Sequence, residues 1–303
     1  MIFKIAWRNI YRNKKRTLIT VTSIFAALFL IILMRALQFG FYDNIITTVV
    51  ESYAGYVEVH AEGYWDNQSL DNAMEVDQKL IDDISSVEGV ENIVQRLQTF
   101  SLISMGEKTK GGVINGVDIS DEQKITDWNK KMLSGSFDLS ENEIIVGKGI
   151  AEYFDIREND TLILYGQGYR GMMAAGKYPV KGVIDLKNPD LNKLGIFMAI
   201  ESARNYVSSE EISTHIIIDK EQYYDEEKIV KDLSQILSKD YEIMTWKKTL
   251  PEIEQTITAD NAGGLIMAFI LYIIVVFGMF GTCLLYTSPS PRDATLSRMP
   301  SSA

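Results

Sequence analysis

The chain has 303 residues, of which 46 % are hydrophobic and 23 % charged, with a formal net charge of −11 at pH 7. This hydrophobic content is sufficient for a packed core and excludes a wholly disordered chain. The acidic balance disfavours a nucleic-acid-binding function, which needs positive charge against phosphates. The single cysteine, Cys283, excludes an intramolecular disulfide.

The N-terminal segment MIFKIAWRNIYRNKKR contains six basic residues and no acidic residue. Its apolar residues recur at helical spacing, so residues 1–16 are predicted to form an amphipathic helix at the cytoplasmic membrane surface. A basic flank without a helix is the alternative interpretation. The residues expected to set the membrane interface and topology are Trp7, Arg8, Arg12, Lys14, Lys15 and Arg16.

Two uncharged apolar stretches are long enough to cross a bilayer: Thr17–Met34 with 18 residues and Gly263–Leu285 with 23. They predict transmembrane helices at 17–37 and 263–283. A cleaved signal peptide is the alternative for the first stretch and a buried core helix for the second. Because basic flanks stay in the cytoplasm, the N-terminus is expected inside and residues 38–262 outside.

The segment between the two spans predicts a mixed α and β domain. Strand, helix and strand patterns follow one another at about 55–98 and again at about 213–247, which indicates a split βαβ subdomain. Short strands and glycine turns fill about 99–212, typical of a β-rich insertion, with short helices expected at 120–133 and 149–154. The predicted fold class is therefore an α+β membrane protein with two transmembrane helices flanking a large extracytoplasmic domain.

The sequence contains no motif that predicts catalysis. GQGYRG at 166–171 matches a dinucleotide-binding pattern, but no long helix follows, so a hairpin loop is expected instead. The chain has no phosphate-binding loop of the G-x-x-x-x-G-K-[ST] type, and its two histidines, His60 and His215, have no ligand-like spacing. We therefore expect no enzyme activity, no catalytic residue, no cofactor and no metal.

Several segments in order resemble permease subunits of the FtsX/MacB superfamily of ABC transporters, in the style of the lipoprotein-releasing LolC and LolE permeases. They are AWRNIYRNKKRTLIT at 6–20, GYVEVHAEGY at 55–64, EIIVGKGIAEYFDIRENDTLIL at 143–164, YPVKGVID at 178–185 and GIFMAIESARNYV at 195–207. Each motif alone is loose, whereas their order is specific. The resemblance covers about residues 1–282.

The resemblance implies a multi-pass protein of the bacterial inner membrane with a MacB-like periplasmic core domain and a porter-like subdomain. It implies a separate cytoplasmic ATPase, a second permease copy or homologous permease as dimer partner, and a periplasmic cargo such as a lipoprotein. The permease would transmit ATP-driven motion to its periplasmic domain for lipoprotein release or a related export. Drug or toxin efflux and control of cell-wall hydrolases stay open within the superfamily.

After the second span, the family continues through a charged coupling segment and two more spans, whereas this chain ends in LLYTSPSPRDATLSRMPSSA. The segment resembles a translated sequencing adapter, so residues 284–303 are expected to be non-native and the permease truncated; a genuine short tail is the alternative. The alternative function, from another functional class, is a two-span sensor or a membrane-anchored binding protein with an extracytoplasmic ligand domain.

Overall fold

The computed structural model describes residues 14–125, 128–157, 160–186, 188–209 and 211–285. Contacts between Cα atoms divide the chain into two compact units. One unit combines Met1–Asp43 with Glu252–Ala303, and the other is Asn44–Pro251. The second unit is referred to below as the central domain.

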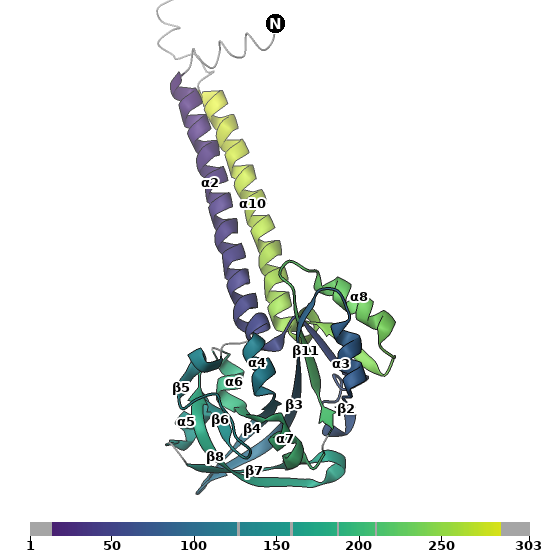
Figure 1. Cartoon of the computed structure of the whole chain (residues 1–303). Helices are drawn as coiled ribbons and strands as arrows, with labels where there is room; N and C mark the ends of the chain where they lie inside the picture. Colours follow the sequence, from purple (N-terminus) through teal and green to yellow (C-terminus); the bar gives the residue numbers. More distant parts are fainter. Residues whose placement is uncertain (1–13, 126–127, 158–159, 187, 210, 286–303) are drawn as a thin grey trace, which may run out of the picture. The chain divides into compact units, whose positions relative to one another are not determined.

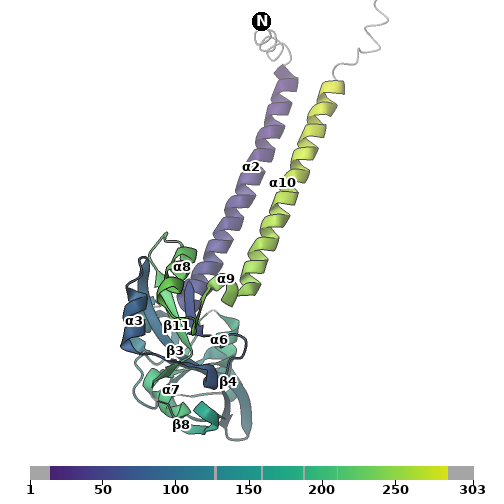
Figure 2. The same cartoon turned by 90° about the vertical axis from the view of Figure 1, so that its right-hand side faces the viewer.

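The first unit is built on two long helices, α2 (Lys14–Ile45) and α10 (Pro251–Leu285), which run side by side in Figures 1 and 2. Both are long and apolar enough to cross a membrane, and their most apolar stretches bury none of their residues in the structure. Phe25 in α2 is 68 % exposed and Phe277 in α10 is 72 % exposed. Apolar exposure on all sides is typical of helices surrounded by lipid.

Polar side chains connect α2 to α10 next to the apolar stretches. Arg35 donates hydrogen bonds to Gln38 at 2.8 Å and to Asn261 at 3.2 Å. Gln38 donates to the hydroxyl of Tyr42 at 2.6 Å and to the main-chain carbonyl of Asp260 at 3.0 Å. These bonds fix the relative register of the two helices where their sequences change from apolar to polar.

One half of the central domain has the order of a split βαβ fold, as the sequence predicts. Its strands lie in the order β12-β1-β11-β3 and each neighbouring pair is antiparallel. Helices α3 and α8 cover one face of this sheet with Leu80, Ile84, Ile229 and Leu233. The elements are β1 (Val57–Ala61), α3 (Gln78–Ser85), β3 (Val90–Met105), β11 (His215–Lys220), α8 (Glu226–Ile236) and β12 (Tyr241–Thr245).

The other half is a closed ring of strands, in which β3 pairs with β4, then β9, β6, β8 and β7 follow, and β7 pairs with β3 again. The interior is filled by apolar side chains such as Ile103, Ile114 and Leu164, as in a small barrel. The strands are β4 (Lys108–Val117), β6 (Ile144–Gly147), β7 (Thr161–Gln167), β8 (Met173–Ile184) and β9 (Gly195–Ala199), with β5 (Met132–Ser134) paired to β8.

Shorter elements connect these strands. The helices α5 (Lys148–Phe154), α6 (Pro189–Leu194) and α7 (Ile200–Val207) lie between strands of the ring, and α9 (Trp246–Thr249) precedes α10. The remaining elements are the π-helix η1 (Ile46–Ala54), the 3-10 turns η2 (Leu70–Asn72), η3 (Trp128–Lys131) and η4 (Tyr169–Gly171), the helix α4 (Ile119–Ile125), and the paired strands β2 (Met74–Glu75) and β10 (Ile212–Ser213).

The predicted border at residue 99 between the βαβ part and the β-rich part falls inside one strand. The segment FSLISM, expected as a separate strand, is the second half of β3, which is continuous over Val90–Met105. The first half of β3 pairs with β11 and the second half with β7, while β4 runs along most of its length. The βαβ part and the β-rich part are therefore joined through one strand of a single sheet.

Two further sequence predictions can be compared with the described residues. The helix expected at 120–133 is interrupted, since α4 ends at Ile125, η3 follows over Trp128–Lys131, and Met132 already belongs to β5. The loop GQGYRG is confirmed as a hairpin, because β7 and β8 are antiparallel on either side of it and Gly168 donates to the carbonyl of Met172 at 2.7 Å.

Most of the predicted interfacial helix at 1–16 and of the tail at 284–303 lies outside the described residues. Of these segments, the structure describes the start of α2 from Lys14 and the end of α10 at Leu285. Pro251 is the first residue of α10, where proline is tolerated because its missing N–H would have no helical partner there.

We predict that Phe197→Ala lowers the free energy of unfolding by about 3–5 kcal/mol. The ring of Phe197 is fully buried and lies 5.0 Å from the ring of Trp128, so truncation leaves a cavity between β9 and η3. Denaturant unfolding of the detergent-solubilised chain, followed by tryptophan fluorescence, measures the change. Phe100→Ala is the control, because Phe100 is 62 % exposed, and an equal loss in both variants would contradict this assignment of the core.

Candidate functional site

The centre of the candidate site is a buried ion pair between β3 and α4. The side chain of Arg96 donates from both Nε and Nη2 to the carboxylate of Glu122, the second bond being 3.0 Å long. Glu122 is fully buried and Arg96 is 4 % exposed. Burial alone would lower the pKa of Arg96, but the charge and hydrogen bond of Glu122, together with Tyr53 and Glu58, outweigh burial and raise that pKa, so the guanidinium stays charged.

The same arginine holds the end of the helical segment that follows α2. Arg96 donates from Nη1 to the main-chain carbonyl of Tyr53 in η1, and its guanidinium lies 4.1 Å from the centre of the Tyr53 ring. The last carbonyls of a helix lack helical partners, and a cation is favoured there. Gly55 then turns the chain into β1 with φ of 76°, where a Cβ atom would lie 2.2 Å from the Ile217 side chain.

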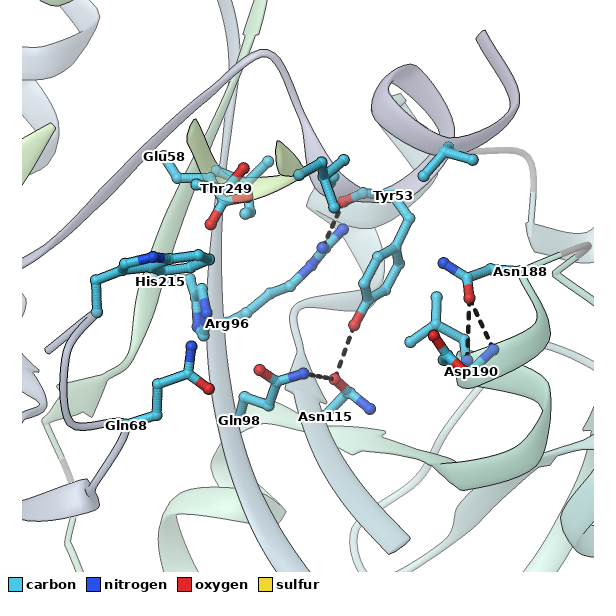
Figure 3. Close-up of a pocket in the computed structure, with 16 residues that line it drawn as sticks. Tyr53, Glu58, Gln68, Arg96, Gln98, Asn115, Asn188, Asp190, His215 and Thr249 are labelled. Atoms are coloured by element: carbon cyan, nitrogen blue, oxygen red, sulfur yellow. Dashed lines mark hydrogen bonds between the residues drawn. The ribbon is translucent and has the colours of Figure 1, made fainter. Parts of the chain in front are cut away.

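A cavity of about 210 Å³ adjoins this ion pair. Figure 3 shows the ring of Tyr53 extending between Arg96 and Asn115, with its hydroxyl donating to the amide oxygen of Asn115 at 2.7 Å. Gln98 donates to the same oxygen at 3.1 Å. Side chains from β1, β3, β4, β11, η1, α6 and α9 line the cavity, among them Glu58, Trp65, Gln68, Arg96, His215 and Thr249. A few polar side chains therefore face a cavity that is otherwise largely apolar, an arrangement typical of small-molecule sites.

Three potential metal ligands gather beside this cavity. Glu58, His60 and His215 each offer one ligand atom, and these atoms lie within 4.8 Å of one another. Glu58 and His60 are two residues apart on β1 and so share a face of the sheet. Val59 pairs with Ile216, so the antiparallel register sets the next residues, His60 and His215, opposite each other.

Burial shifts the pKa of one histidine and two tyrosines in this region. Burial, together with the charges of His60 and Arg96, holds the pKa of His215 well below its ordinary value, so its imidazole is neutral near pH 7. Burial also raises the pKa of Tyr53 and that of Tyr64 to about 12. The tyrosine hydroxyls therefore remain hydrogen-bond donors across the physiological range.

The sequence analysis did not bring the two histidines together, because they are far apart along the chain. The signal was present in the strand patterns: in VEVHA the valines alternate with Glu58 and His60, and yet all four of these residues are buried. Buried polar residues on one face of a strand need partners. The predicted split βαβ order, in which β1 lies beside β11, supplies that partner as His215.

The residues predicted to set topology are described only in part. Trp7, Arg8 and Arg12 lie outside the described residues. Lys14 and Lys15 are exposed in the first turn of α2, and Arg16 follows them in the same helix. Their expected role at the membrane interface stays a prediction.

A second surface feature is an exposed apolar patch on the strand ring. Leu102 of β3 pairs directly with Tyr165 of β7, and these side chains are 46 % and 45 % exposed. Met172 and Met173, next to the GQGYRG hairpin, are 58 % and 83 % exposed. With Phe100, these residues form a group of large apolar side chains open to solvent, which marks an interaction surface.

Several solved structures are similar to this chain in three dimensions. The chain is similar to the extracellular domain of the ABC-type transporter YknZ from Gram-positive bacteria, with 12 % identity and a TM-score of 0.44 over 63 % of this chain and 100 % of that one. It is also similar to the periplasmic region of MacB from Actinobacillus actinomycetemcomitans, with 13 % identity and a TM-score of 0.46 over 69 % and 95 %. Both TM-scores are below 0.5, so neither likeness establishes a shared fold.

No protein-family model matches the chain, and no curated protein matches it in sequence.

We predict that Arg96→Met destabilises the central domain by about 3–5 kcal/mol, because it leaves the carboxylate of Glu122 buried without its partner. The double variant Arg96→Met with Glu122→Leu is expected to recover part of that loss. Urea unfolding of the three proteins measures both effects. Lys124→Ala removes an exposed ion pair with Asp121 on the same α4 helix and serves as control, with little change expected. An Arg96→Met variant as stable as Lys124→Ala would contradict the buried pair.

We also predict a late tyrosine titration. The pKa of Tyr53 and that of Tyr64 are raised above the ordinary value of 10.0 to about 12, so the folded state binds more protons than the unfolded state between these values. The contribution of these two tyrosines to the free energy of unfolding is therefore complete below pH 10 and is lost as the pH rises towards about 12. Tyrosinate absorbance at high pH measures the two late groups, and Tyr53→Phe removes one of them. An unchanged late fraction in that variant would contradict the assignment.

Proposed function

We propose that the chain is the permease subunit of an ABC transporter and transmits motion from a cytoplasmic ATPase to its central domain outside the membrane. The observation that carries the proposal is helical continuity: α2 and η1 together run without a break from Lys14 to Ala54, and η1 ends on the buried Arg96. On the other side, α10 runs unbroken from Pro251 to Leu285. In this proposal, both spans connect directly in sequence to the central domain, and motion of the spans is passed to it through these two connections.

The ordered sequence motifs shared with FtsX/MacB permeases support this proposal, as do two uncharged helices of membrane-spanning length. The basic residues before the first span favour a cytoplasmic N-terminus and an extracytoplasmic central domain in a bacterial inner membrane. The chain has no phosphate-binding loop of its own, so ATP hydrolysis is assigned to a separate subunit. A second permease copy or a homologous permease would complete the membrane part.

For the cargo, we propose a molecule with a lipid or apolar part, such as a lipoprotein. The exposed side chains of Met172, Met173, Tyr165 and Leu102 support this, since flexible methionines and aromatic rings suit adaptable apolar contacts. The proposed role of this patch is to touch cargo as the domain moves.

A membrane-anchored binding protein or sensor is the second candidate function. The cavity of about 210 Å³ beside Arg96 favours it, because a small ligand held there would contact the residue that anchors η1. In this case the same helices would pass a ligand signal towards the cytoplasm rather than receive motion from it.

We predict that a photo-reactive amino acid placed at Lys15, which is exposed at the start of α2, crosslinks in cells to a protein with an ATP-binding cassette. The same amino acid at the exposed Glu107 in the central domain is the matched control, and it should yield no cytoplasmic partner. Mass spectrometry of the crosslinked products identifies the partners.

The outcomes separate the two candidate functions. Crosslinks from Lys15 to an ABC ATPase, lost when the ATPase gene is deleted, agree with the permease. Crosslinks from Lys15 to a signalling protein such as a kinase would contradict it and favour the sensor.

A further inference from the structure

We propose that Glu58, His60 and His215 form a binding site for a divalent transition-metal ion of the Zn²⁺ class. These are the only two histidines in 303 residues, and the fold sets them opposite each other on adjacent strands with a carboxylate on the same face. Two imidazoles and one carboxylate make up a ligand set typical of zinc and related ions. The proposal is independent of the permease function.

The hydrogen bonds of His60 determine which ring nitrogen faces the other ligands. Nδ1 of His60 lies 3.1 Å from the main-chain carbonyl of Thr214, which accepts but cannot donate, so Nδ1 carries the proton. Metal-bound histidines usually donate their second ring N–H to a carbonyl or carboxylate in this manner. Nε2 is then the nitrogen directed towards Glu58.

The contact between His60 and Glu58 is close without being a hydrogen bond. Nε2 lies 3.2 Å from Oε2 of Glu58, yet among the described residues this buried nitrogen has no aligned hydrogen-bond partner. In a tetrahedral zinc site, neighbouring ligand atoms are roughly 3.3 Å apart, and the line between them lies about 35° from the nitrogen–metal bond. That separation agrees with the observed distance of 3.2 Å between the two atoms.

His215 is arranged in the same way. Its Nδ1 lies 2.7 Å from the hydroxyl of Thr214, and this hydroxyl accepts from the main-chain N–H of Gln98 and donates to the carbonyl of Arg96. The hydroxyl proton is thereby used, so Nδ1 of His215 donates to the hydroxyl oxygen and Nε2 keeps its lone pair. Thr214 thus orients both imidazoles through its backbone and its side chain.

The surroundings close the site on one side and leave it open on another. The rings of Tyr64 and Trp65, in the turn after β1, each lie 5.5 Å from the ring of His60. Glu58 and His215 line the cavity, which can supply a water molecule or a ligand donor as the remaining partner of the ion. The charge of Arg96, opposite His215 on β3, is compensated by Glu122.

The test is a zinc titration of the full chain in detergent micelles, purified through a tag without histidines. Competition with a chromophoric chelator gives stoichiometry and Kd, and Co²⁺ in place of Zn²⁺ gives a visible absorption spectrum of the ligand field. We expect one ion per chain, a Kd raised at least about 10-fold in Glu58→Gln and in His215→Gln, and a change in the Co²⁺ spectrum. Glu91→Gln removes an exposed carboxylate on β3 and should bind as the unchanged chain does.

Folding is checked separately, because His60 is fully buried. Each variant is compared by its near-ultraviolet circular dichroism, and Zn²⁺ is expected to raise the Tm of the unchanged chain and of Glu91→Gln but not that of His215→Gln. The proposal is overturned if the folded unchanged chain binds no Zn²⁺. It is equally overturned if His215→Gln and Glu58→Gln, both folded, bind Zn²⁺ as tightly as the unchanged chain.

Discussion

Two long helices, α2 and α10, expose apolar side chains to their surroundings, and the proposed membrane arrangement rests on this exposure. The most apolar stretches of α2 and α10 bury nothing in the described structure, and residues such as Phe25 and Phe277 are largely exposed. Removing a large apolar side chain from water is worth about 1.5–3 kcal/mol, so two such helices strongly favour a lipid environment. Both functions proposed for the chain require a folded domain that is connected at each end to an apolar helix.

Within the central domain, η1 makes polar contacts as well as apolar ones. Arg96 contacts the end of η1, pairs with Glu122 and lies opposite His215 in the sheet, so one side chain joins the helical segment, the cavity and the histidine cluster. A buried ion pair is costly to break and directional in its hydrogen bonds.

Periodicity and charge in the sequence are sufficient to predict most elements of the fold. The hairpin at GQGYRG follows from local patterns that the structure confirms, and the strand order β12-β1-β11-β3 agrees with the expected βαβ pattern. The continuity of β3 across two sheets could not be predicted, because no local residue marks where a strand changes partner. The histidine cluster was missed for a related reason: His60 and His215 meet only through the register of β1 against β11.

The central claim, that two spans hold the domain outside the cytoplasm, is tested most directly by cysteine labelling in intact cells. In a Cys283→Ser background, single cysteines replace Glu107 in the central domain and Lys15 before the first span, both exposed positions. A membrane-impermeant maleimide is expected to label Glu107→Cys in whole cells and Lys15→Cys only after lysis. Labelling of Lys15→Cys in whole cells, with Glu107→Cys protected until lysis, would contradict the account.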